Sequence, residues 1–344
     1  MTKSQFICIY CLKREPELIP SEAHIIPAAI GGTRYSKKIV CKNCNGLTNQ
    51  MFENAVIERF AFFRSIWGIK SRKKDRVPHV STKLKFADIE GKVSIDQNGE
   101  LTGPIVMTNL DTNGIKEYRV IGFGEKGKKQ AEIKRQQISA KHPNVAWEEV
   151  HHAETPLIQF VIETPEVDDI ILRRLAAKVA FESWAEKRAS LVASDSQYAQ
   201  IRDFILTGNH DFCSGVLPAP PPLTGLSDLP VGIHAGGIVH NVSSPILGAF
   251  IVFFGLFHYW VLISTSYQSL QSDDEFWIEN PQKGYFPDSK LRCQARPILI
   301  DWGQYVRAWR NDPQGILKKA VTYNEAKFQE AWREALQDGR VLKP

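Results

Sequence analysis

The chain has 344 residues, of which 43% are apolar and 24% are charged. These fractions exclude a disordered chain, and the length allows two or three domains. Residues 1–80 contain 14 Lys and Arg against 6 Asp and Glu, whereas residues 81–344 contain 29 against 32. A basic N-terminal part is expected for a protein with a polyanionic partner, although a solvated basic surface gives the same counts.

Two Cys-x-x-Cys pairs stand close together near the N-terminus, Cys8 with Cys11 and Cys41 with Cys44. Each pair turns two sulfur atoms toward one point, and four thiolates complete the tetrahedral coordination of a structural Zn²⁺ ion. Ordinary reduced cysteines are the alternative, but two matched spacings favour zinc. Because four cysteines leave no open coordination position, we expect any catalysis to come from other residues of this segment.

No signal peptide precedes the first cysteine pair, so we expect a cytoplasmic protein. The two remaining cysteines, Cys213 and Cys293, are then expected to be reduced and buried. They stand far apart in the sequence, and nothing in their spacing requires that they touch.

An extended segment with a histidine lies between the two cysteine pairs. Prolines near both ends keep Ile19–Pro27 out of a helix, and His24 stands inside it. Gly31-Gly32 predicts a turn. After the second cysteine pair, apolar residues at helical spacing predict a helix over 45–66, which Gly68 ends.

These features together resemble the HNH endonucleases, in the branch in which a zinc ribbon supports a ββα-metal fold. The resemblance rests on the cysteine pairs, on the sequence Ala-His-Ile-Ile-Pro around His24, on the glycine pair and on Asn45 directly after the second cysteine pair. It implies that His24 activates the attacking water and that Asn45 binds Mg²⁺ or Mn²⁺ through its amide oxygen.

The sequence departs from the family pattern directly before the histidine, where Ala23 replaces the usual acid and cannot bind a metal. Glu22, Asn49 and Glu53 are the other candidate oxygen ligands for the catalytic metal. Glu22 is one residue further back, and alternate residues of an extended segment face opposite ways. The alternative therefore stays open that the nuclease site has decayed, leaving a zinc-stapled module that binds nucleic acid or protein.

A basic run follows the predicted helix. Its members are Lys70, Arg72, Lys73, Lys74 and Arg76. The run either contacts the phosphates of a nucleic acid or forms an exposed linker to the next domain. From 77 to 162, short alternating segments separated by Asn-Gly turns predict a β-rich region with a helix near 129–140.

The rest of the chain predicts a mixture of helices and strands. Thr164-Pro165 is expected to begin a helix, a second helix is expected over 197–206, and Thr322 with Glu325 is expected to cap a terminal helix. The proline-rich stretch 218–223 predicts an exposed connection, and 297–300 predicts a last strand.

The segment Ile246–Thr265 contains no formally charged residue and is long enough to cross a membrane as a helix. Gly255 and His258 in its middle, the lack of Lys or Arg directly outside it, and its many aromatic and β-branched residues argue against that interpretation. We expect two buried strands that turn near Gly255.

The sequence therefore predicts an α+β protein with a zinc-stapled ββα-metal HNH module over 1–68, a β-rich region over 69–163 and a mixed α+β region over 164–344. The predicted activity is metal-dependent endonucleolytic cleavage of DNA. By analogy alone, the protein is an effector in bacterial defence against phage or foreign DNA. The expected partners are nucleic acid, an activating ligand or protein at the C-terminal region, and a second copy of the chain, but no membrane.

Overall fold

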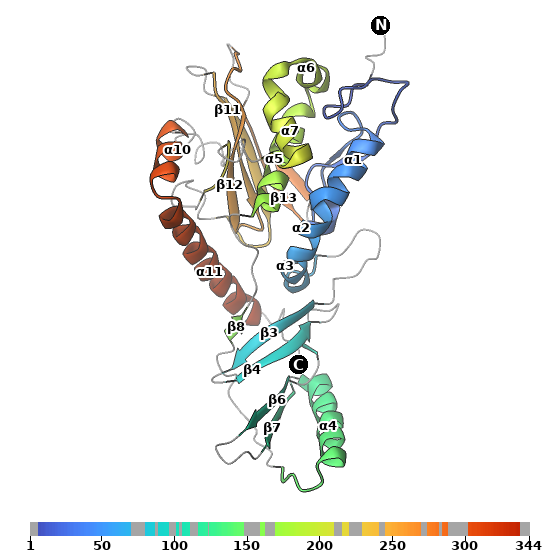
Figure 1. Cartoon of the computed structure of the whole chain (residues 1–344), viewed down its shortest axis with the longest axis vertical. Coiled ribbons are helices and arrows are strands. Elements are labelled where there is room, and N and C mark those ends of the chain that lie inside the picture. The colour runs from blue at the N-terminus through green and yellow to red at the C-terminus, as the bar shows by residue number, and fades with distance from the viewer. Residues whose placement is uncertain are drawn as a thin grey trace. The chain divides into compact units, whose positions relative to one another are not determined.

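A computed structural model describes residues 6–69, 80–86, 89–95, 101–102, 105–110, 116–122, 124–147, 159–161, 169–209, 215–219, 229–240, 245–269, 274–281, 284–287 and 302–337. The chain divides into two compact units (Figure 1). Met1–Phe60 and Pro165–Ala331 form the first unit, and Ala61–Thr164 and Trp332–Pro344 form the second. The N-terminal segment thus shares a unit with the C-terminal half, while the three-part division at 68 and 163 stays a prediction.

The N-terminal part of the first unit is a pair of short strands followed by a helix. Strand β1 (Ala23–His24) and strand β2 (Tyr35–Ser36) pair antiparallel, with His24 opposite Tyr35. The short 3-10 helix η1 (Ala28–Ile30) lies between the strands, and helix α1 (Lys42–Thr48) follows them. The ββα order expected of the N-terminal module is therefore present.

The glycine pair makes the connection between the two strands possible. Gly31 has a φ of 102°, in the left-handed region that favours glycine. A Cβ atom on Gly32 would lie 1.9 Å from the carbonyl oxygen of Ile26. Both positions therefore need residues without a side chain, as the turn prediction requires.

The helix predicted over 45–66 begins earlier and is not a regular α-helix throughout. The helical segment begins with α1 at Lys42. Cys41 is the N-cap of α1, and its sulfur accepts a hydrogen bond from the Cys44 N–H at 3.5 Å. The later members are the π-helical turn η2 (Asn49–Glu53), α2 (Asn54–Arg59) and α3 (Ala61–Ile66). Gly68 follows with a φ of 63°, as expected of a helix stop.

A six-stranded antiparallel sheet forms the centre of the first unit. Its strand order is β14-β13-β10-β11-β12-β9. The strands are β9 (Val216–Pro218), β10 (His234–His240), β11 (Leu247–Phe253), β12 (Phe257–Ser264), β13 (Glu275–Asn280) and β14 (Gly284–Pro287).

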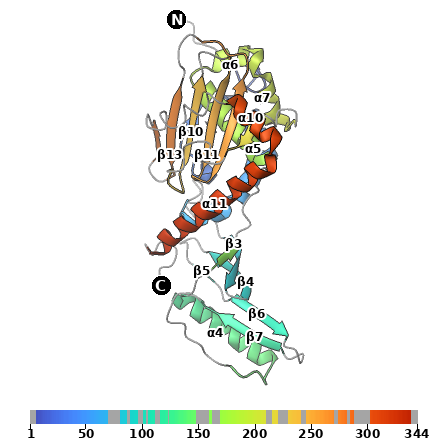
Figure 2. The ribbon, with the colours of Figure 1, turned by 90° about the vertical axis from the view of Figure 1, so that its left-hand side faces the viewer.

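The uncharged segment Ile246–Thr265 forms strands β11 and β12, which turn at Gly255 with a φ of 67°. Every residue of β10 and β11 is buried. Helices α10 (Trp302–Asn311) and α11 (Pro313–Gln337) lie on one side of the sheet, and α5 (Ile170–Ala185) lies on the other (Figures 1 and 2). A sheet covered on both faces explains the continuous apolar sequence. None of the described helices is long and apolar enough to cross a membrane.

Three further helical segments lie between α5 and the sheet strands in the sequence: α6 (Ala189–Ser194), the 3-10 helix η3 (Ser196–Tyr198) and α7 (Ala199–Thr207). Gly208 caps α7 with a φ of 73°, so the predicted helix over 197–206 is confirmed. Helix α5 is buried from Leu172 to Ala185, because it packs against the sheet, against α7 and against the N-terminal helices.

Two predicted helix starts are wrong. Helix α5 begins at Ile170, where the side chain of Asp169 serves as N-cap, and not at Thr164-Pro165. Helix α11 begins at Pro313, so Thr322 lies inside it and caps nothing. In both places a sequence offers several capping signals, and packing of the apolar face decides which one is used.

The prediction that the proline-rich stretch 218–223 is an exposed connection is wrong for its first residue. Pro218 ends strand β9 and is buried, and Ala219 after it is buried too. Strand β9 lies at the edge of the sheet, where a proline is tolerated because one side of the strand needs no hydrogen-bond donor.

The second unit contains two sets of paired strands and a helix. Four strands form an antiparallel sheet in the order β5-β4-β3-β8, and β6 and β7 form a separate hairpin. The elements are β3 (Val80–Phe86), β4 (Ile89–Ile95), β5 (Leu101–Thr102), β6 (Ile105–Leu110), β7 (Lys116–Ile121), α4 (Gly124–Lys141) and β8 (Gln159–Val161). The predicted β-rich region with one helix is confirmed, although α4 begins earlier than expected.

Four predictions lie outside the described residues. These are the basic run over 70–76, the rest of the proline-rich stretch over 220–223, the strand over 297–300, and the state of the cysteines Cys213 and Cys293.

Candidate functional site

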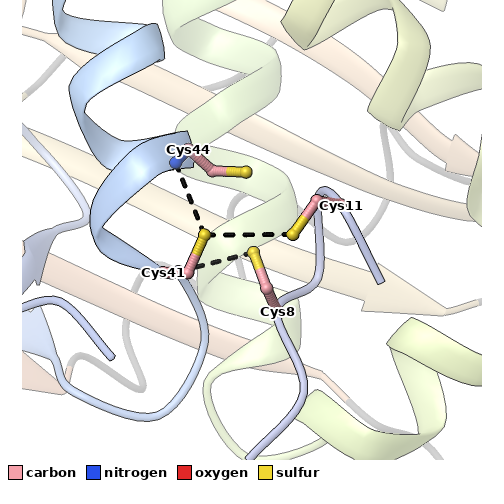
Figure 3. A group of neighbouring side chains, drawn as sticks. All are labelled: Cys8, Cys11, Cys41 and Cys44. Carbon is pink, nitrogen blue, oxygen red and sulfur yellow. Dashed lines mark hydrogen bonds between the residues drawn. The ribbon is translucent and has the colours of Figure 1, made fainter. Parts of the chain in front are cut away.

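The two cysteine pairs meet at one point of the first unit (Figure 3). The four Sγ atoms of Cys8, Cys11, Cys41 and Cys44 all lie within 4.8 Å of one another, and those of Cys11 and Cys41 are 3.9 Å apart. Zinc–sulfur bonds of about 2.3 Å in a tetrahedron give sulfur–sulfur separations of about 3.8 Å. The cluster is therefore arranged to hold a metal ion such as Zn²⁺.

The surroundings of the cluster favour a thiolate at Cys8, and the thiolate is the form that binds metal. Burial raises the pKa of Cys11. The Cys41 N–H lies 3.4 Å from the Cys8 sulfur, to which it donates a hydrogen bond. A hydrogen bond from the Cys44 side chain, together with backbone hydrogen bonds, lowers the pKa of the Cys8 thiol to about 5 despite burial. The same hydrogen bond raises the pKa of Cys44. An all-sulfur donor set selects zinc over magnesium or calcium.

His24 lies on β1, where two elements hold its backbone. On one side β1 pairs with β2, and the Ile25 N–H donates to the carbonyl of Arg34 at 3.1 Å. On the other side, the carbonyl of His24 accepts a hydrogen bond of 2.7 Å from the ammonium group of Lys178 on α5. The imidazole ring is partly exposed, and its centroid lies 5.7 Å from that of the Tyr35 ring.

Asn45 lies on α1 and contacts the extended segment that contains His24. Its side-chain nitrogen donates a hydrogen bond of 3.0 Å to the hydroxyl of Ser21. The backbone N–H of Lys42 also donates to the carbonyl of Ile19 at 2.8 Å, so the start of α1 is fixed to this segment at two places. Because the amide nitrogen is engaged, the amide oxygen of Asn45 remains as its acceptor end.

The three other candidate ligands of the catalytic metal are engaged elsewhere in the protein. The side-chain nitrogen of Asn49 donates to the backbone carbonyl of Asn45 at 2.8 Å. Glu53 is buried in the π-helical turn, with its Oε1 atom 3.5 Å from the ammonium of Lys178. Glu22 forms an ion pair of 3.5 Å with Lys37 at the surface. Their role as ligands stays a prediction.

Within the described ranges, the four cysteines are the only group of three or more Cys, His, Asp or Glu side chains that is arranged for a metal ion. Asn45 and Asn49 would instead supply amide oxygens as ligands. The basic run over 70–76, predicted to bind nucleic acid, lies outside the described residues.

Sequence reasoning missed a buried polar cluster on α5. The ammonium of Lys178 lies 2.9 Å from Glu182 one helical turn later, and the hydroxyl of Tyr10 donates to the other oxygen of Glu182 at 2.8 Å. Lys178 and Glu182 are almost completely buried. The available signal was a Lys and a Glu four residues apart on one face of a largely apolar helix.

The pKa values in this cluster reflect burial and the opposite charges. Burial raises the pKa of Glu182 to about 7, against the lowering effect of Lys178. Burial alone would lower the pKa of Lys178, but the carboxylates of Glu182 and Glu53 raise it above its ordinary value. Lys178 therefore remains a charged ammonium group inside the protein.

A second set of contacts holds the connection between β1 and β2. The carboxylate of Glu279 on β13 accepts hydrogen bonds from the backbone N–H groups of Thr33 and Arg34, the latter at 2.7 Å. The Arg34 side chain donates to Glu186, directly after α5, at 2.9 Å. The carbonyl of Ile30 lies 2.9 Å from Nε2 of the buried His234 on β10. The C-terminal half thus contacts both ends of this connection.

The first unit combines a cysteine cluster that fits zinc, two antiparallel strands with a histidine on the first, and a helix after the second cysteine pair. These are the features of a ββα module with a metal-binding cysteine cluster. The model of the HNH endonuclease family matches residues 8–61. The predicted HNH module is therefore confirmed, and an HNH domain indicates nuclease activity and nucleic-acid binding. Comparisons with curated proteins and with solved structures give no match.

Proposed function

We propose that this protein is a metal-dependent endonuclease that hydrolyses phosphodiester bonds in DNA. The observation that carries the proposal is the joint position of His24 and Asn45. They lie on the first strand and on the helix of the HNH segment, and Asn45 is hydrogen-bonded to Ser21, three residues before the histidine. A base and an oxygen ligand on adjacent elements are what metal-assisted hydrolysis needs.

His24 acts as the general base in this proposal. Imidazole exchanges a proton near neutral pH, which makes histidine a suitable group to activate water. The ring is partly exposed, so a water molecule and a phosphate can reach it. The backbone on both sides of the ring is hydrogen-bonded, which limits how far the ring can move from its position.

Asn45 is the first ligand of the catalytic metal in this proposal. A bound Mg²⁺ or Mn²⁺ ion would supply positive charge beside the phosphate and its leaving oxygen. Asn49 and Glu22 are further candidates, and Glu53 would have to leave Lys178 to take part. Ala23 is fully buried on β1 and has no oxygen atom in its side chain to bind a metal. The ligand set here therefore differs from that of relatives with an acid before the histidine.

Charge supports a nucleic-acid substrate. The first 80 residues carry 14 basic against 6 acidic side chains, and such an excess attracts a polyanion. We extend the proposal to DNA as the substrate, to cleavage by pairs of chains, and to an effector role in defence against phage or foreign DNA, with the C-terminal region as the part that receives the signal. This extension rests on analogy with HNH proteins.

The second candidate function is a zinc-stapled module that binds nucleic acid or protein without cleaving it. The missing acid at Ala23 and the engagement of Glu53 with Lys178 favour it. It predicts binding that is independent of Mg²⁺ and Mn²⁺, and no strand breaks under any condition.

Cleavage of supercoiled plasmid, single-stranded DNA and RNA with Mg²⁺ or Mn²⁺ tests the proposal. Three proteins are compared at equal zinc content: the wild type, His24→Ala, and the control His142→Ala, which replaces an exposed histidine of the second unit. We expect the wild type and the control to cut plasmid and His24→Ala to be inactive. Equal cleavage by His24→Ala would refute the role of His24. Binding without cleavage in all three proteins would favour the second candidate.

A further inference from the structure

Lys178 is an unusual residue for the middle of a helix that is buried along its length. Its side chain is fully buried, and a buried ammonium group is strongly destabilising unless its donors are satisfied. Its three N–H donors match three acceptors: the carbonyls of His24 and Ile25, at 2.7 and 3.1 Å, and Glu182 at 2.9 Å. Two of the three acceptors are therefore the backbone carbonyls of the proposed general base and of the residue directly after it.

The strand itself is too short to hold the histidine firmly. Strand β1 contains only Ala23 and His24, and it pairs with β2 on one side. On the edge of β1 away from β2, the His24 carbonyl binds the ammonium of Lys178, where a further strand would otherwise supply an N–H group. The same ammonium binds the carbonyl of Ile25, directly after the strand. In an extended strand the carbonyl lies in the plane of the sheet and the side chain stands out of it. Fixing the His24 and Ile25 carbonyls therefore fixes the rotation of the strand and the direction of the imidazole.

The buried cluster of Lys178 and Glu182 also contacts the first cysteine pair and the helical segment after α1. Glu182 accepts a hydrogen bond from Tyr10, which stands between Cys8 and Cys11 of the first cysteine pair. Glu53, which lies on the helical segment after α1, is 3.5 Å from the Lys178 ammonium. One buried group on α5 thus contacts the strand directly, the helical segment by an ion pair, and the first cysteine pair through Glu182.

We propose that Lys178 is a positioning residue of the nuclease site, which orients His24 by binding the two carbonyl oxygens at His24 and Ile25. This inference rests on the proposed function, since it assigns His24 a catalytic role. It makes α5 a part of the nuclease site, although α5 lies outside the segment that matches the HNH family. Lys178 itself touches neither water nor substrate.

Four variants test the proposal in the full chain. Lys178→Met keeps the length of the side chain and removes the donors. Lys178→Met combined with Glu182→Gln also removes the carboxylate that would otherwise lose its partner, because neutral replacement of a buried ion pair is often tolerated. Lys178→Arg restores a donor group. Lys187→Met is the matched control, since Lys187 follows α5 but is exposed and pairs with Glu275.

We expect Lys178→Met, alone or with Glu182→Gln, to keep its zinc and to lower kcat for plasmid cleavage about a hundredfold, the effect of a misplaced catalytic group. The KM should stay within about threefold, because no substrate contact is lost. Lys178→Arg should recover part of kcat, and Lys187→Met should match the wild type. Wild-type kcat in zinc-loaded Lys178→Met would overturn the proposal. If neither methionine protein accumulates with zinc, the NMR signal of His24 in Lys178→Arg decides, and an unmoved signal would overturn the proposal.

A second measurement does not depend on cleavage. In the NMR spectrum of histidine-labelled protein, the His24 signal is the one that is missing from His24→Ala. We expect this signal to shift or broaden in the Lys178 variants while the signal of His142 stays unchanged. If the wild type cuts no nucleic acid but the His24 signal still moves, the nuclease function fails and the positioning role stands. An unmoved His24 signal refutes the positioning role whatever the activity.

Discussion

Acid should destabilise the first unit through His234, and the size of the effect follows from its contacts. The ring is fully buried, with Nε2 placed 2.9 Å from the Ile30 carbonyl and Nδ1 placed 3.4 Å from the Phe254 N–H. Only the neutral ring satisfies both partners, donating from Nε2 and accepting at Nδ1. Burial lowers the pKa of His234 from 6.5 to about 4.

A histidine whose pKa is lower in the folded state stabilises the fold only while it is neutral. Above pH 6.5 the full contribution is present. As the pH falls from 6.5 to about 4, His234 becomes protonated in the unfolded chain but stays neutral in the folded protein. Its contribution to the free energy of unfolding is lost over this range. A difference of about 2.5 pKa units corresponds to about 3 kcal/mol of unfolding free energy across this range. The buried His258 has a pKa lowered to about 3 and acts in the same direction.

Urea unfolding at pH 7.5, 5.5 and 4, followed by tryptophan fluorescence, measures this loss. His234→Gln isolates the contribution of His234, because glutamine keeps a donor for the Ile30 carbonyl and does not titrate in this range. We expect His234→Gln to be less stable than the wild type at pH 7.5, since the Phe254 N–H loses its acceptor. The gap should shrink by about 3 kcal/mol at pH 4. A gap that stays constant with pH would refute the argument from burial.

Four further predictions concern stability. Removal of zinc with a chelator, or Cys44→Ser, should lower the melting temperature together with the zinc content measured by metal analysis; an unchanged melting temperature in metal-free protein would contradict a structural role of the cluster. Gly32→Ala places a methyl group 1.9 Å from the Ile26 carbonyl oxygen and should cost several kcal/mol, roughly 3 or more. Gly46→Ala, with nothing within 4 Å in helix α1, should stabilise by up to about 1 kcal/mol. Arg174→Met removes the hydrogen bonds to the last carbonyls of α7 and should cost about 1–3 kcal/mol in urea unfolding.

The zinc cluster and the ββα order were predictable because their signals are local. Cys8, Cys11, Cys41 and Cys44 follow a ligand spacing that is set by the geometry of a single ion, and the glycine pair at 31–32 is required by a turn of the backbone itself. The apolar strands β11 and β12 were predictable for a similar reason. Their composition and a glycine at the turn are sufficient to distinguish two buried strands from one helix.

The surroundings of the site were not predictable in this way. The Lys178 ammonium binds the carbonyl of a residue 154 positions earlier in the chain, and Glu279 binds the backbone of Arg34 from 245 positions away. No periodicity or motif predicts such partners, because a backbone carbonyl or N–H has the same chemistry in every residue. The wrong helix starts at Thr164-Pro165 and Thr322 have a related cause: capping residues permit a start, and tertiary packing selects it.

The contacts of the HNH segment also concern the expectation that the C-terminal region is a sensor separate from the nuclease module. A separate sensor domain would leave the nuclease module with its own core and a weakly packed boundary. Here Lys178, Glu279 and His234 satisfy backbone groups of the strand pair and its connection, and Tyr10 and Glu53 have their polar partners on α5. Cutting the chain after the HNH segment would leave buried polar groups without partners, which costs about 1–3 kcal/mol for each group. The HNH segment therefore depends on the rest of the first unit for the partners of its buried polar groups.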